Sequence, residues 1–101
     1  PIHAIALYRS GVLVQIPRPE RFGIHKLIVA DRRRGGPTQP KARKDLAQAA
    51  FLISVLAEDR PDDLANAYQD ALSRGPRWRE RIASSLTKLP SVAETLAGLT
   101  R

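Results

Sequence analysis

The chain has 101 residues, of which 43% are hydrophobic and 27% charged; its net charge is +7, and it contains neither cysteine nor methionine. This composition fits one folded domain and excludes a disordered chain, while the lack of cysteine excludes disulfides, thiolate metal sites and a cysteine nucleophile. No apolar run approaches the roughly 18 residues of a membrane span, and the chain opens without a signal segment. We therefore expect no membrane partner and a cytoplasmic location.

The positive charge is concentrated in the first half of the chain. Residues 1–44 carry ten Lys and Arg against Glu20 and Asp31, whereas residues 45–101 carry seven against eight acids. Such asymmetry favours an anionic partner for the first half, such as a nucleotide, a nucleic acid or an acidic neighbouring domain. A solvated basic face without a partner is the alternative.

Residues 1–17 predict a β-hairpin. Two segments rich in β-branched and aromatic residues, His3–Tyr8 and Val12–Ile16, flank a turn at Arg9-Ser10-Gly11. Two strands alone are marginally stable, so we expect the hairpin either to extend a sheet that this chain otherwise lacks or to pack on the helices of the chain itself. We accordingly expect the chain to be a piece of a longer protein.

Residues 18–101 predict a helical C-terminal domain. Prolines followed by apolar residues at helical spacing indicate helix starts, and the pair Gly35-Gly36 indicates a flexible loop that could serve as a hinge. The expected helices begin at Pro17–Glu20 (ending near Arg34), Lys41 (ending at Glu58), Pro61 (stopped by Gly75), Pro76 (ending near Pro90) and Ser91 (stopped by Gly98). Ser91 and Glu94 have capping-box spacing for the last helix. The predicted fold class is mainly α with a short N-terminal β-hairpin, that is, a hairpin plus a four- or five-helix bundle.

The chain contains no recognisable set of residues for independent catalysis. His3 and His25 lie far apart, and neither has a second ligand at metal-binding spacing. There is no Gly-x-Ser-x-Gly, and no glycine-rich phosphate loop precedes a helix. A metal site or a hydrolase site made by this chain alone is therefore not expected.

Several short motifs are spread over most of the chain. Gln15–Leu27 reads Gln-Ile-Pro-Arg-Pro-Glu-Arg-Phe-Gly-Ile-His-Lys-Leu; the further segments are Arg33-Arg34, Lys41-Ala-Arg-Lys-Asp-Leu-Ala-Gln-Ala49 and Arg74-Gly-Pro-Arg-Trp78. In these segments the chain resembles the C-terminal part of an uncharacterised bacterial nucleotidyltransferase-fold family in the DNA polymerase beta superfamily. It is more distantly similar to AbiEii-type toxin nucleotidyltransferases. The resemblance implies the C-terminal part of an α+β nucleotidyltransferase.

The resemblance also implies roles for two residues. Lys26 would contact the triphosphate, and Asp45 would be the catalytic carboxylate that orients a base or a reacting hydroxyl. A carboxylate on the second helix could also hold the lysine in place. The alternative is that Lys26 and Asp45 form an ordinary interhelical ion pair. Gln48 stands where the toxins often have a second aspartate.

A basic cluster surrounds the predicted loop. We expect Arg33, Arg34, Lys41 and Lys44 to bind phosphates of a nucleotide or of an RNA acceptor, with Arg32 and Arg43 beside them. No aromatic residue interleaves the cluster, so base stacking there is not expected. We expect Trp78, which is spaced like a helix residue with Ile82, to serve packing rather than stacking.

One motif of active nucleotidyltransferases is missing from the chain. Such enzymes hold two Mg²⁺ ions with an Asp-x-Asp pair that follows a Gly-Ser turn, and no Asp-x-Asp occurs here. We expect Mg²⁺ in the parent protein only and none bound by this chain, which would need a missing N-terminal catalytic domain to be active. Two functions remain open: a module of a nucleotidyltransferase that binds nucleoside triphosphate or acceptor, or a non-catalytic basic module that binds nucleic acid or a partner protein.

Overall fold

The structure is a computed structural model that describes residues 4–9 and 12–100, with side chains from residue 18 onward. Strand β1 (Ala4–Arg9) pairs antiparallel with strand β2 (Val12–Pro17), in a register that sets Ala4 opposite Pro17 and Arg9 opposite Val12. Ser10 and Gly11 of the predicted turn lie outside the described residues.

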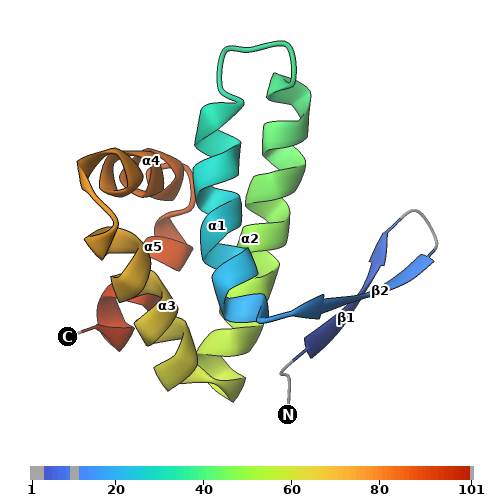
Figure 1. Cartoon of the computed structure of the whole chain (residues 1–101), viewed down its shortest axis with the longest axis vertical. Helices are drawn as coiled ribbons and strands as arrows, with labels where there is room; N and C mark the ends of the chain where they lie inside the picture. The colour runs from blue at the N-terminus through green and yellow to red at the C-terminus, as the bar shows by residue number, and fades with distance from the viewer. Residues whose placement is uncertain (1–3, 10–11, 101) are drawn as a thin grey trace.

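Five helices follow the strands (Figure 1). They are α1 (Pro19–Arg32), α2 (Gln39–Asp59), α3 (Pro61–Ser73), α4 (Pro76–Leu86) and α5 (Pro90–Leu99). Each has a proline at its first or second position, and none has a side-chain hydrogen bond at its N-cap. A proline there has the helical φ already and lacks an N–H that would need a partner. The prediction of a proline start is confirmed for α1, α3 and α4, whereas α2 and α5 were expected to begin at Lys41 and Ser91 and begin at Gln39 and Pro90.

The last helix departs from its predicted limits. The N-cap of α5 is Leu89 rather than Ser91, so the predicted capping box is wrong. Ser91 lies inside the first turn, where its carbonyl accepts a hydrogen bond from Thr95. Gly98 also lies within α5 and does not end it, because a glycine with ordinary helical φ costs a helix only about 1 kcal/mol.

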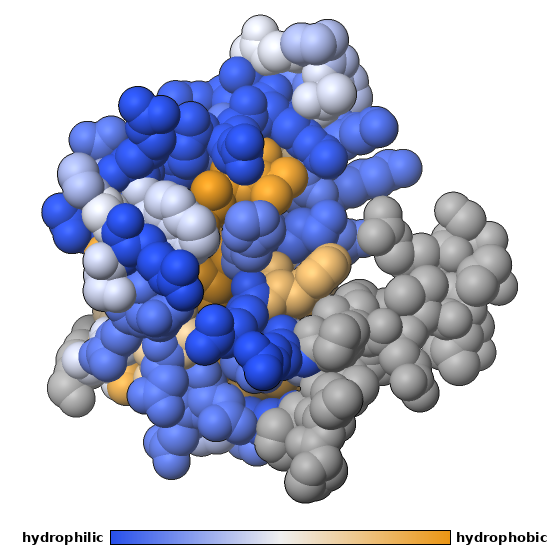
Figure 2. All heavy atoms as spheres, in the orientation of Figure 1, coloured by the Kyte–Doolittle hydropathy of each residue, from blue (hydrophilic) through white to orange (hydrophobic). Residues whose placement is uncertain are grey.

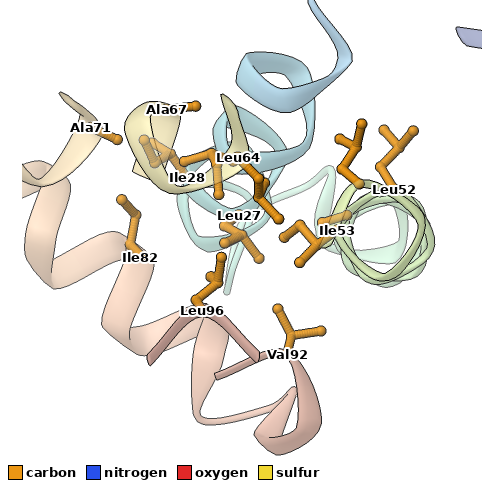
Figure 3. Packing of buried hydrophobic residues seen from close by; sticks show 13 residues of the cluster. Leu27, Ile28, Leu52, Ile53, Leu64, Ala67, Ala71, Ile82, Val92 and Leu96 are labelled. Atoms are coloured by element: carbon orange, nitrogen blue, oxygen red, sulfur yellow. The ribbon is translucent and has the colours of Figure 1, made fainter. Parts of the chain in front are cut away.

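The hydrophobic core lies between the helices (Figure 3). Its side chains come from all five helices, and the largest of those that are fully buried are Ile24, Leu27, Leu52, Ile53, Leu56, Leu64, Ile82 and Leu96. Burying one such side chain contributes about 1.5 to 3 kcal/mol, so this cluster supplies the main force that holds the bundle together. None of the helices in the described part of the chain is long and apolar enough to cross a membrane.

Helices α1 and α2 form an antiparallel pair with a close approach at Gly23 (Figure 1). A Cβ atom on Gly23 would lie 3.4 Å from the Cβ of Leu52. The glycine therefore lets the two backbones approach closely. The packing that this allows offsets part of the free energy that a glycine costs inside a helix. This close pair fixes how side chains of α1 meet those of α2.

The predicted fold class needs a correction. Residues 18–100 carry the described side chains and the core, and they form helices without a strand, so the folded body is an all-α bundle of five helices. Strands β1 and β2 pair with each other in a two-stranded sheet, and the described part of the chain has no further strand. The physical reason is that every helix buries its apolar stripe against other helices, so the core closes without a sheet.

Candidate functional site

The best-defined polar site of the molecule joins α1 to α2 at Asp45. This aspartate is 3% exposed. Its Oδ1 accepts a hydrogen bond of 2.9 Å from Lys26 Nζ, and its Oδ2 accepts one of 2.8 Å from Arg33 Nη1. These are the short distances expected when both donor and acceptor are charged. A buried carboxylate is stable only with such partners, so the two cations are needed for Asp45 to lie where it does.

The helical period of α1 explains why Lys26 and Arg33 share one carboxylate. They are seven residues apart, which is close to two helical turns, so they lie on one face of α1 toward α2. Phe22 lies one turn before Lys26 on the same face, and Lys26 Nζ is 5.2 Å from the centre of its ring. The aromatic face adds a favourable cation–π contact to the ion pair.

The cluster of Lys26, Arg33 and Asp45, here called the Asp45 cluster, carries a net charge of +1. The side chain of Lys26 is 15% exposed and that of Arg33 is 30% exposed, so both cations remain partly open to solvent. Both oxygens of Asp45 are already occupied. This arrangement holds two partly exposed cations in fixed positions, whereas a general base would require the carboxylate to leave its partners.

Arg34 belongs to a different cluster from Arg33. Its Nη1 donates to Ser84 Oγ at 3.2 Å, and its Nε lies 3.6 Å from Asp31 Oδ1. Arg81 of α4 approaches the other oxygen of Asp31 at 3.5 Å. The side chains of Arg33 and Arg34 therefore point in different directions, because adjacent residues at a helix end point about 100° apart. Arg33 faces α2, and Arg34 faces α4.

Lys41 and Lys44 do not join the Asp45 cluster. Both are exposed in the first turns of α2, and neither forms an ion pair within the described part of the chain. Arg43 instead lines a separate cleft of about 570 Å³ together with Arg34 and Lys88. The predicted basic cluster is thus spread over several faces of the helix pair. Sequence reasoning missed Lys88, because only the packing of the α4–α5 connection brings it close.

Gln48 lies one turn after Asp45 on α2. Its Oε1 is buried and has no hydrogen-bond partner within the described residues. An unpaired buried acceptor costs free energy, so a donor that reached this position would be stabilising. A carboxylate at this position would add a second negative charge one turn from Asp45.

The residues described do not fit a magnesium site. Mg²⁺ prefers several oxygen ligands, and both oxygens of Asp45 are taken by cations that would repel a metal ion. Within residues 4–9 and 12–100, no group of three or more histidine or carboxylate side chains lies close enough to hold a metal. Asp62 and Asp63 are exposed at the start of α3, where they complement the helix dipole.

Comparison with known proteins identifies the family. A family model described as Nucleotidyltransferase matches residues 1–73, which include every member of the Asp45 cluster. The chain belongs to this nucleotidyltransferase family. No curated protein and no solved structure matches it.

Proposed function

We propose that this chain is the helical module of a nucleotidyltransferase and that it binds the triphosphate of a nucleoside triphosphate through Lys26 and Arg33. The observation that carries the proposal is the Asp45 cluster, in which one buried carboxylate holds two partly exposed cations at 2.9 and 2.8 Å. In this proposal Asp45 is a positioning residue: it fixes where the cations lie, and the phosphates meet the solvent-exposed side of each.

The charges around the cluster support a phosphate ligand. Lysine supplies a compact charge and arginine a planar fork, and both are used for phosphoryl oxygens in proteins. The cluster keeps a surplus charge of +1, and the exposed cations Arg32, Lys41 and Lys44 raise the positive potential nearby. Arg34 faces α4 and is not part of the proposed contact.

We further propose that the metal-binding carboxylates come from a catalytic domain outside these 101 residues. The sequence contains no Asp-x-Asp, and the described acids do not converge on one place. The chain alone then binds nucleotide without transferring it. Mixing it with that domain and Mg²⁺ should restore transfer of a nucleoside monophosphate, measured with radiolabelled triphosphates and candidate acceptors.

The test is binding of radiolabelled nucleoside triphosphates to the chain and to two matched variants. Lys26→Ala removes a proposed contact and should weaken binding by about ten- to a hundredfold, since one charge-assisted contact contributes about 1.5 to 3 kcal/mol. Lys88→Ala removes the same charge on an exposed lysine away from the cluster, and should change binding less than about threefold. Circular dichroism checks that both variants are folded.

Asp45→Asn tests the positioning role of this residue. An amide can accept a hydrogen bond from only one of the two cations, so Asp45→Asn should release the other cation, weaken nucleotide binding and make the fold less stable. If the three residues form only a structural ion pair, Lys26→Ala and Lys88→Ala will have the same small effect on affinity. That result, or no binding at all, would overturn the proposal.

The exposed cations favour a second candidate function, which is a non-catalytic module that binds nucleic acid. Lys41, Lys44 and Arg32 are exposed on the α1–α2 pair, where a phosphodiester backbone could reach them. This function predicts single-stranded RNA binding that falls steeply with salt and does not depend on Lys26. A nucleotidyltransferase module predicts instead that ligand binding depends on Lys26.

A further inference from the structure

A second cleft lies between α1, α3 and α4. Its volume is about 380 Å³. Part of its wall is made by Ala67 and Ala71 of α3, with Ile24 of α1 beside them. The two alanines are one helical turn apart and project toward α1, so the space that larger side chains would fill stays open.

Aromatic rings line this cleft. Phe22 and His25 come from α1 and Trp78 from α4, and the rings of His25 and Trp78 lie 6.0 Å apart with a tilt of 53°. Trp78 is half-buried and packs against the hydrophobic core, so the packing role expected from the sequence is confirmed. The packing also holds its ring at the wall of the cleft, where it can meet a flat ligand.

The remaining lining of the cleft is polar and mostly cationic. Arg18, Arg21 and Arg74 lie there with a single acid, Asp70, which leaves a net charge of +2. Arg74 Nη2 lies 3.2 Å from Asp70 Oδ2, and its guanidinium carbon is 5.8 Å from the centre of the Trp78 ring. Arg21 approaches the same carboxylate at 4.0 Å. The cleft therefore combines apolar rings with an excess of anion-binding groups.

Arg18 has an unusual backbone conformation. Its φ is +50° in the left-handed region, and it is the one described residue other than glycine with a positive φ. Such a conformation costs an arginine about 1 kcal/mol and must be held by its surroundings. It occurs where the chain enters α1, at the lining of the cleft.

We propose that this cleft binds the base of a nucleotide, with a phosphate of the same ligand directed toward its arginines. Stacking rings suit any nucleobase, cations suit the phosphate, and Asp70 can accept a hydrogen bond from an exocyclic amine. The inference rests on the proposed function for its ligand class and adds where the base is held. Figure 2 shows that the face of the molecule seen in Figure 1 is mostly hydrophilic, with a small hydrophobic area.

Phe22 connects the two sites. Its ring lines the cleft and also lies 5.2 Å from Lys26 Nζ. The cleft and the Asp45 cluster therefore adjoin at this ring. The same base-and-phosphate chemistry could instead come from the terminal nucleotide of an RNA acceptor.

The experiment uses the fluorescence of Trp78, the only tryptophan of the chain. The chain is titrated with ATP, with a short single-stranded RNA and with inorganic tripolyphosphate, which lacks a base, and free tryptophan controls for absorption by the ligands. ATP or RNA should quench Trp78, whereas tripolyphosphate should not. The ligand that quenches at lower concentration identifies the source of the base.

Two matched arginine variants and one alanine variant test whether the ligand that quenches Trp78 binds in the cleft. Arg74→Ala removes a cation from the cleft. It should raise the ligand concentration that gives half-maximal quenching by about tenfold. Arg77→Ala removes an exposed arginine next to Trp78 in sequence that lines a different cleft, and should have little effect. Ala67→Leu fills the cleft without changing any charge and should abolish quenching. Circular dichroism confirms that each variant is folded.

The outcomes separate this inference from the proposed function. Quenching that Ala67→Leu abolishes supports the base site even if Lys26→Ala has no effect on affinity. Nucleotide binding that depends on Lys26 but leaves Trp78 fluorescence unchanged supports the triphosphate site and overturns the base site. Quenching that Arg74→Ala and Ala67→Leu leave unaltered also overturns it.

Discussion

Two contacts of α1 with its neighbours centre on an aspartate, and they differ in a way that composition does not show. Toward α2, Asp45 meets two cations at 2.9 and 2.8 Å and its side chain is 4% exposed. Toward α4, Asp31 also meets two cations, but at 3.6 and 3.5 Å, and its side chain is 9% exposed. Each centre contains one aspartate and two cations, yet only the first has short charge-assisted hydrogen bonds.

The difference teaches that the contact distances of such a centre, rather than its number of charges, decide how much it contributes to the stability of the fold. A carboxylate with two short bonds in a buried place depends on its partners, and they in turn are fixed by it. A carboxylate with longer contacts to partly exposed arginines contributes about as much as a surface ion pair. The α4 contact has a different anchor, because Ser85 donates a buried hydrogen bond to the carbonyl of Leu27.

Asp45→Ala should be the most destabilising of the changes that test this comparison. It leaves Lys26 and Arg33 without their shared partner and opens a small cavity, so the free energy of unfolding should fall by about 3 kcal/mol. Urea denaturation followed by circular dichroism measures it. Glu58→Ala, an exposed acid on the same helix, should change stability by less than about 0.5 kcal/mol. Equal effects of the two would show that the Asp45 cluster contributes no more than a surface charge.

Ser85→Ala should come next. The hydroxyl is 3% exposed, and its loss removes the buried bond to Leu27, at a cost of about 1.5 kcal/mol. Ser54→Ala, which removes an exposed hydroxyl bonded to the carbonyl of Phe51, is the control and should be close to neutral. If Ser85→Ala also left the thermal unfolding unchanged, another interaction would have to stabilise the contact between α1 and α4.

Asp31→Ala should have the smallest effect, about 0.5 to 1 kcal/mol, since its contacts are long and Arg34 can turn to solvent. The measurement is urea denaturation at low and high salt. Because exposed pairs are screened, the loss should shrink at high salt, whereas the loss from Asp45→Ala should persist. A loss from Asp31→Ala as large as that from Asp45→Ala would remove the distinction between the two centres.

The sequence predicted the elements of this molecule better than it predicted which side chains meet. Apolar spacing, with prolines for three of them, located the five helices, and the resemblance singled out Lys26 and Asp45, which the fold brings together with Arg33. The basic cluster predicted from charge grouped Lys41 and Lys44 with Arg33, although neighbouring helix positions point in different directions.

Two features depended on packing that sequence spacing does not contain. Lys88 reaches the cleft with Arg34 and Arg43 only through the placement of α4 and α5. The aromatic cleft exists because Ala67 and Ala71 face α1, and no local pattern indicates which neighbour an alanine will face. Tertiary arrangement therefore determined these sites, after local propensity had determined the helices.

The prolines that open all five helices have a consequence for the unfolded chain. Each fixes one φ angle before folding begins, so the unfolded ensemble has fewer conformations to lose, and a compatible proline typically stabilises a protein by about 0.4 to 1 kcal/mol in this way. Part of the stability of this bundle therefore comes from entropy that is absent from the denatured state, and no contact in the folded molecule reveals it.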